Sequence, residues 1–162
     1  MTRSTALIAL GSNLGDRSAH LSAALDAIAQ LPDTAIIATS SIHETDPVGP
    51  PGQGPYLNAV CRIETAIEPR ELLETLLDIE RSRGRDRDQE QRWGSRTLDL
   101  DLILYADRVI DEPGLTLPHP RLHERAFVLD PAAEVASELV VPTLGCSIAD
   151  LVQRLRASAP VS

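Results

Sequence analysis

Leucine alternates with aspartate in the run RTLDLDL, residues 96–102. A period of two is typical of a β-strand, because successive side chains of a strand point to opposite faces. Asp99 and Asp101 are therefore predicted to share one face, with their Cα atoms about 6.6 Å apart, while the leucines face a core. Two carboxylates at this spacing can bind magnesium, which takes oxygen ligands and fills its other positions with phosphates and water. An edge strand with a solvated acidic face would give the same pattern.

The segment before this strand, residues 84–96, is polar, begins with glycine and lacks apolar periodicity, so a long loop is predicted. Its basic residues are Arg85, Arg87, Arg92 and Arg96. A guanidinium group binds phosphate oxygens in a planar fork and neutralises charge in phosphoryl transfer. Arginines beside paired carboxylates indicate a site that binds a polyphosphate through metal and guanidinium groups. A solvated charged loop is the alternative interpretation.

The composition excludes several nucleotide-binding scaffolds. All 15 basic residues are arginine, whereas a P-loop and a protein kinase both need a lysine. The glycine motifs GxxxxGK[ST] and GxGxxG do not occur. A bound nucleotide would therefore be held by metal and arginine on another scaffold. The net charge of −9 argues against nucleic acid or an acidic membrane surface as a partner.

The two cysteines, Cys61 and Cys146, are too few for a disulfide framework or a zinc site, and Cys61 is expected to be a small buried hydrophobe. The apolar run at residues 6–10 is too short for a signal peptide or a membrane span. We therefore expect a cytoplasmic protein with no membrane or nucleic-acid partner, and we expect it to be a monomer.

Strand and helix signals alternate along the chain without repeats or linkers, so residues 1–162 are expected to form a single domain. The expected order is a strand over 5–10, a helix stopped by Pro32, an extended stretch over 34–45, a strand over 56–65, a helix opened by Pro69, the aspartate strand, and a last helix over 147–157. Residues 46–55 and 111–125 are expected to be loops, with Val109 and Ile110 as a short hairpin partner. The order β-α-β-β-α-β favours an α+β fold, a ferredoxin-like antiparallel sheet with packed helices.

Four aromatic side chains are present: Tyr56, Trp93, Tyr105 and Phe127. Three of them lie beside predicted loops rather than within apolar periods. Flat rings in such places suit stacking on a planar heterocycle, and packing of loop anchors on the core is the alternative.

The residues resemble a known family. Over roughly residues 5–140, in order and spacing, the chain is similar to the 6-hydroxymethyl-7,8-dihydropterin pyrophosphokinases of folate biosynthesis. The matching motifs are ALGSNLGD (9–16), YLNA (56–59), GR (84–85), RWGSRTLDLD (92–101), LPHPR (117–121) and ERAFVL (124–129). The RWGSRTLDLD run together with PHPR is highly specific.

The resemblance implies transfer of the β,γ-diphosphate of ATP to the hydroxymethyl group of the pterin, with release of AMP. It implies that Asp99 and Asp101 hold two magnesium ions that bridge the triphosphate. The implied triphosphate-binding residues are Arg85, Arg96, His119 and Arg125, with Arg87 and Arg92 arriving on the mobile loop. Arg121 is a candidate replacement for a further arginine that some relatives carry where this chain has Gly114.

The same resemblance implies that Glu80 and Leu102 lie by the adenosine and that the pterin stacks between Tyr56 and Phe127. Asn58 and the backbone from Thr45 to Val48 would bind the polar edge of the pterin. Trp93 would close over the substrates with the loop, which is expected to order when both are bound. Two other classes stay open: a different magnesium-dependent nucleotide transferase that uses Asp-x-Asp, and a non-catalytic ferredoxin-like ligand-binding module.

Overall fold

The computed structural model describes residues 2–45, 55–84 and 97–158. Its main sheet contains β1 (Ser4–Ser12), β2 (Thr34–Thr39), β3 (His43–Thr45), β4 (Tyr56–Thr65) and β5 (Asp99–Tyr105). The strand order is β2-β4-β1-β5, with β3 also paired to β4, and all of these pairs are antiparallel. This confirms the predicted ferredoxin-like α+β fold.

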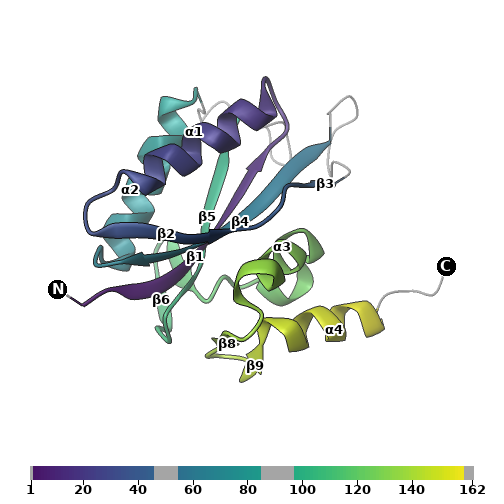
Figure 1. Ribbon diagram of the computed structural model, residues 1–162. Helices are drawn as coiled ribbons and strands as arrows, with labels where there is room; N and C mark the ends of the chain where they lie inside the picture. Colours follow the sequence, from purple (N-terminus) through teal and green to yellow (C-terminus); the bar gives the residue numbers. More distant parts are fainter. Residues whose placement is uncertain (1, 46–54, 85–96, 159–162) are drawn as a thin grey trace.

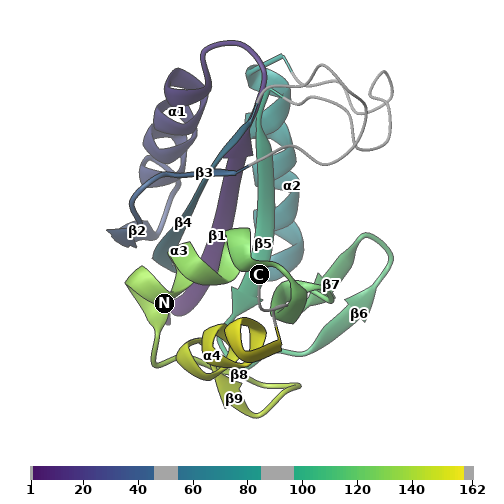
Figure 2. The same ribbon diagram turned by 90° about the vertical axis from the view of Figure 1, so that its right-hand side faces the viewer.

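Helices cover both faces of the sheet. Helices α1 (Arg17–Ala29) and α2 (Pro69–Ser82) pack on one face, and α3 (Ala126–Ala136) and α4 (Ile148–Ser158) lie on the other, as Figure 1 shows. Figure 2 shows α3 crossing in front of the strands. The remaining elements are two small hairpins and a 3₁₀ turn: β6 (Ile110–Glu112) with β7 (Leu115–Leu117), β8 (Val140–Val141) with β9 (Cys146–Ser147), and η1 (Leu122–Glu124).

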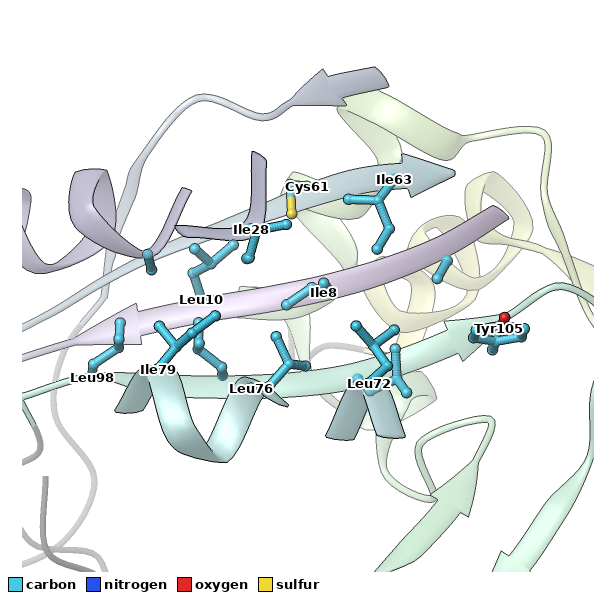
Figure 3. Close-up of a cluster of buried hydrophobic side chains, with 14 of the residues drawn as sticks. Ile8, Leu10, Ile28, Cys61, Ile63, Leu72, Leu76, Ile79, Leu98 and Tyr105 are labelled. Carbon is cyan, nitrogen blue, oxygen red and sulfur yellow. The ribbon is translucent and has the colours of Figure 1, made fainter. Parts of the chain in front are cut away.

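The larger core lies between the sheet and the pair α1 and α2. Its side chains come from alternate positions of each strand and from the apolar stripes of the two helices (Figure 3). Leu98, Leu100 and Leu102 belong to it, as the alternation in the sequence predicted. Cys61 is fully buried in the same core, and burial raises the pKa of its thiol to about 12.

A second apolar core lies on the opposite face of the sheet. It explains why the sequence of β5 changes from alternating leucine and aspartate to a continuous apolar run. Ile103 and Leu104 pack with α3 and α4 on the face of the sheet that also carries Asp99 and Asp101. A register shift between Leu7 and Ile8 in the β1–β5 pairing accommodates the two consecutive residues on this face. The acidic face of β5 therefore ends where the second helical layer begins to cover it.

Local signals account for the first two helices. Asp16 caps α1, because its carboxylate accepts a hydrogen bond from the backbone N–H of Ala19 at 3.1 Å. Pro69 stands in the first turn of α2, where its missing N–H costs no hydrogen bond. Arg83, at the end of α2, donates to Nδ1 of His20 in α1 at 3.0 Å and links the two helices.

The structure corrects three expectations. The stretch 34–45 is not one strand, because the Ser40 hydroxyl replaces a backbone carbonyl and accepts from Val60 N–H at 2.9 Å, which separates β2 from β3. Residues 111–125 contain β6, β7 and η1 rather than loop alone. Helix α3 was not expected, since Arg125 at its N-cap and Pro131 inside it are poor helix signals.

No helix among the described residues is long and apolar enough to cross a bilayer.

Candidate active site

A cavity of about 410 Å³ opens on the face of the sheet beside α3. Strands β1, β3, β4 and β5 form its floor and two of its walls, and η1 with the start of α3 forms the opposite wall. The residues that line it are Ala9, Leu10, Gly11, Thr45, Tyr56, Asn58, Ala59, Asp99, Asp101, Arg121, Glu124, Arg125, Phe127 and Val128.

The carboxylate pair lies on one wall, as predicted. Asp99 and Asp101 are partly buried and both line the cavity. Their register partners on β1 are Gly11 and Ala9, so two small residues of that strand lie next to the carboxylates. This arrangement leaves open space in front of two anionic groups on a rigid strand, which suits a hard cation together with the oxygens of its ligand.

The second wall carries amide, hydroxyl and aromatic groups. Asn58 is buried, and its Nδ2 donates to Oγ1 of Thr45 at 2.7 Å, which fixes the orientation of the amide. Tyr56 pairs with Thr45 at the start of the same ladder. The guanidinium group of Arg17 in α1 holds this end of β4 by donating to the carbonyl of Pro55 at 2.8 Å. A planar ring with hydrogen-bonding groups along one edge would find complementary chemistry here.

The opposite wall is basic and aromatic. Arg121 and Arg125 line the cavity, and Nε of Arg121 donates to the Glu124 carboxylate at 3.2 Å. The guanidinium carbon of Arg125 lies 5.6 Å from the centroid of the Phe127 ring, a cation–π distance. The Phe127 ring lines the cavity and is 41% exposed, so it is accessible from the cavity.

His119 stands beside this wall as a neutral imidazole. Burial, with the charge of Arg125 adding to it, lowers the pKa of His119 to about 4. The backbone N–H of Arg121 donates to Nδ1 of His119 at 3.2 Å, so Nε2 carries the proton of the neutral ring. The side chain can therefore donate one hydrogen bond to an anion without contributing a charge near neutral pH.

Two predicted residues lie away from the cavity. Glu80 is buried, and its carboxylate accepts from the backbone N–H of Leu100 at 2.7 Å. The Leu102 side chain packs in the larger core, on the side of β5 opposite the aspartates. Their roles beside an adenosine stay predictions.

The structure brings eight of the predicted residues together at the cavity: Thr45, Tyr56, Asn58, Asp99, Asp101, Arg121, Arg125 and Phe127. Six others lie outside the described residues, namely Val48, Arg85, Arg87, Arg92, Trp93 and Arg96, as does the expected closing loop. Six lining residues were not predicted from the sequence: Ala9, Leu10, Gly11, Ala59, Glu124 and Val128. Ala9 and Gly11 could have been found from the small-large-small pattern of the strand that faces the aspartates.

Among the described residues, no group of three or more His, Cys, Asp or Glu side chains could hold a metal ion. A pair of carboxylates fits magnesium rather than zinc, because magnesium is usually bound by one or two carboxylates and completes its shell with phosphates and water. The donor set at Asp99 and Asp101 is therefore compatible with a metal that arrives together with a phosphate ligand.

The comparison with known proteins agrees with this chemistry. The family model described as 7,8-dihydro-6-hydroxymethylpterin-pyrophosphokinase (HPPK) matches residues 7–137. The chain belongs to this family. Curated HPPK relatives named 2-amino-4-hydroxy-6-hydroxymethyldihydropteridine pyrophosphokinase include proteins of Haemophilus influenzae and Bacillus subtilis. The first is 49% identical over 85% of this chain and 85% of its own length, and the second is 46% identical over 83% and 79%.

Solved structures of HPPK proteins share the fold. A crystal structure of an HPPK-DHPS in complex with substrates matches 96% of this chain with a TM-score of 0.76 at 12% identity. A Plasmodium falciparum HPPK-DHPS triple mutant matches 94% of the chain with a TM-score of 0.73 at 13% identity. The chain spans 44% and 43% of those two longer chains. At such low identity the match shows the fold alone.

Proposed function

We propose that this HPPK family member transfers the β,γ-diphosphate of ATP to 6-hydroxymethyl-7,8-dihydropterin and releases AMP, a step of folate biosynthesis. One observation carries the proposal: a single cavity is lined by a carboxylate pair on β5, by an amide and a tyrosine ring on β4, and by two arginines and a phenylalanine ring at η1 and α3. These are the groups needed to hold a metal-bound polyphosphate beside a flat polar heterocycle.

In this proposal Asp99 and Asp101 hold two magnesium ions. The bound metal would neutralise and orient the triphosphate, which is the main requirement of a loose phosphoryl transition state. The chain's own contribution is a rigid pair of carboxylates on β5, next to the open floor formed by Ala9 and Gly11. In the transfer, the pterin hydroxyl oxygen bonds to the β-phosphorus, the bond from that phosphorus to the α,β-bridging oxygen breaks, this oxygen leaves with AMP, and the hydroxyl proton passes to solvent.

The arginines serve the triphosphate. Arg121 and Arg125 line the cavity and would neutralise phosphate oxygens that the metal leaves uncovered. His119 would donate from Nε2, since its Nδ1 already accepts from Arg121 N–H. The resemblance adds Arg85 and Arg96 as further ligands, and Arg87 and Arg92 as groups that arrive on the loop. It also puts Trp93 over the substrates and Glu80 and Leu102 beside the adenosine.

The pterin would lie between the rings of Tyr56 and Phe127. Its polar edge would face Asn58 and Thr45, whose side chains are already hydrogen-bonded to each other, and the backbone near Val48. Preorganised groups of this kind align the hydroxymethyl oxygen with the β-phosphorus. Alignment and charge neutralisation suffice for this chemistry, so we assign no general base. We also propose that the protein acts as a cytoplasmic monomer.

The test is AMP formation from ATP with 6-hydroxymethyl-7,8-dihydropterin as acceptor, with and without magnesium. AMP and diphosphorylated pterin in equal amounts, formed only with the metal, support the proposal. If ATP were consumed with another acceptor but not with the pterin, the protein would be a different magnesium-dependent nucleotide transferase. Pterin binding without any AMP would indicate a non-catalytic module.

A further inference from the structure

A hydrogen-bonded cluster joins the edge of the sheet to α3 outside the cavity. Oε1 of Glu134 in α3 accepts from the backbone N–H of Ser41 at 2.9 Å and from its hydroxyl at 2.8 Å. Oε2 of Glu134 also bonds the Nε2 atom of His43, the first residue of β3. These partners are more than ninety positions apart in the sequence, with separations of 93 and 91 residues.

Although serine, histidine and glutamate meet here, the geometry is not that of a nucleophilic triad. In a triad the imidazole uses one nitrogen for the nucleophile and the other for the carboxylate. Here the same Nε2 atom of His43 faces both the Ser41 hydroxyl, at 3.3 Å, and Glu134. The hydroxyl also lies within hydrogen-bond distance of both carboxylate oxygens. The cluster is therefore a structural connection rather than a second reaction centre.

The connection reaches the strand that carries one wall of the cavity. Strand β3 pairs only with β4 among the described strands, where His43 lies opposite Asn58 and Thr45 lies opposite Tyr56. A three-residue strand paired on one side has little to hold it in place. Glu134 binds the first residue of β3, His43, and the carboxylate of Glu44 lies 3.9 Å from the guanidinium group of Arg17 in α1. Because His43 and Thr45 belong to the same short strand, the bond from Glu134 to His43 also restricts the position of Thr45. The Thr45 hydroxyl in turn accepts from Asn58.

On α3, Glu134 is two helical turns from Phe127. Residues i and i+7 lie on the same face of a helix, about 10.5 Å apart along its axis. One face of α3 thus presents Phe127 to the cavity and Glu134 to the edge of the sheet. The helix carries the Phe127 wall, β3 and β4 carry the Asn58 wall, and Glu134 is a hydrogen-bonded tie between them.

We propose that Glu134 is a positioning residue for the pterin: it holds β3 against α3 and so sets the spacing between the Phe127 wall and the wall of Thr45 and Asn58. This inference rests on the proposed function. Glu134, Ser41 and His43 do not line the cavity, so the effect acts through the walls and not through contact with a substrate.

The experiment compares steady-state kinetics of E134A, E134Q and a matched control, E138A. Glu138 follows the same helix and also ties it to the sheet, because its carboxylate accepts from Arg62 of β4 at 2.6 Å. That strand position pairs with Leu7, away from the cavity. E134A therefore removes an acidic contact from α3 to β3, and E138A removes one from the segment after α3 to β4, where Arg62 also donates to the carbonyl of Val135 at 3.1 Å.

For E134A we expect the pterin KM to rise about fivefold or more, with the ATP KM within about twofold of wild type. E134Q keeps an acceptor for Ser41 N–H, so its pterin KM should lie closer to wild type. E138A should leave the pterin KM unchanged even if it lowers the melting temperature. In a background that already carries F127A, the E134A change should raise the pterin KM by a smaller factor than it does in the wild type. The reason is that one of the two walls is already lost.

Wild-type AMP formation tests the proposed function by itself. If the wild type is active and E134A has an unchanged pterin KM, the positioning role is overturned and the proposed function stands. An equal rise in the ATP KM, or an equal effect of E138A, would also overturn it, since the tie would then support α3 in general. If E134A does not fold, H43A takes its place, because it removes the bond from β3 to Glu134 and leaves α3 intact, and an unchanged pterin KM in H43A would overturn the positioning role.

Discussion

Asp99 of β5 and Gly11 of β1 are register partners in the antiparallel ladder that forms the floor of the cavity. A Cβ atom on Gly11 would lie 3.4 Å from Oδ1 of Asn58 and 3.8 Å from Cδ1 of Tyr56. These are ordinary contact distances, and Gly11 does not adopt the left-handed backbone conformation that favours glycine. The fold would therefore accept a side chain here, and the absence of one keeps space open between the carboxylates and the pterin wall.

The first prediction is that G11A reduces pterin affinity about tenfold or more, because a methyl group would fill the floor where the ring is expected to lie. The free energy of unfolding should stay unchanged or rise by up to about 1 kcal/mol, since alanine restricts the unfolded chain more than glycine does. Calorimetric titration with the pterin and chemical denaturation check the two parts. Loss of stability together with unchanged pterin affinity would show that Gly11 serves backbone packing instead.

The second prediction concerns the carboxylate pair. D99N and D101N should each lower turnover by about 100-fold or more, because neutralisation of the triphosphate by bound metal is worth several kcal/mol. Both variants should still fold, because each side chain lies at the cavity and outside the two apolar cores. Turnover at saturating magnesium and a melting curve test this together. Normal magnesium-dependent turnover in either variant would exclude the pair as the metal site.

The third prediction separates the two substrates. F127A should weaken pterin binding roughly five- to tenfold, because the stacking of a ring is worth about 1 kcal/mol or more. It should leave ATP binding almost unchanged. Phe127 is 41% exposed, so its removal should cost little stability. Y56A should act in the same direction on the other wall. A parallel fall in ATP affinity in calorimetry would mean that these rings support the structure of the site and do not stack on the pterin.

The sequence predicted those parts of the fold and site that depend on local pattern. The alternation at Asp99 and Asp101 determined their shared face, and Pro69 marked the start of α2. The sequence pattern did not predict helix α3, because almost every residue from Phe127 to Ala133 is apolar or small and the helical period is therefore not visible. Pro131 also argues against a helix. Glu134 could not be selected, since its partner Ser41 is brought near only by the packing of α3 on the sheet.

The fourth prediction uses the neutral state of His119. Its pKa is lowered to about 4 in the folded protein, from an ordinary value of 6.5, so the unfolded chain binds the proton first as the pH falls. The folded state should therefore lose stability between pH 6.5 and about 4 on account of this group. H119N keeps an acceptor near Nδ1 for Arg121 N–H and cannot titrate, so its stability should fall less over this interval. The free energy of unfolding is measured by urea denaturation at several pH values. An equal fall of this free energy with pH in both proteins would contradict the assignment.

The last prediction concerns Glu134 at lower pH. Hydrogen bonds from the Ser41 backbone N–H, then from the side chains of His43 and Ser41, lower the pKa of its carboxyl to about 2 from an ordinary value of 4.5. A lowered carboxyl pKa contributes stability that is fully present above pH 4.5 and is lost as the pH falls towards 2. E134Q should therefore be less stable than wild type at pH 6, and the difference should shrink below pH 4.5. E138A is the control for a carboxylate just beyond the end of α3, whose pKa is also lowered, chiefly by its hydrogen bond from Arg62. A stability difference between E134Q and wild type that stays constant from pH 6 to pH 3 would show that the cluster does not depend on the charge of Glu134.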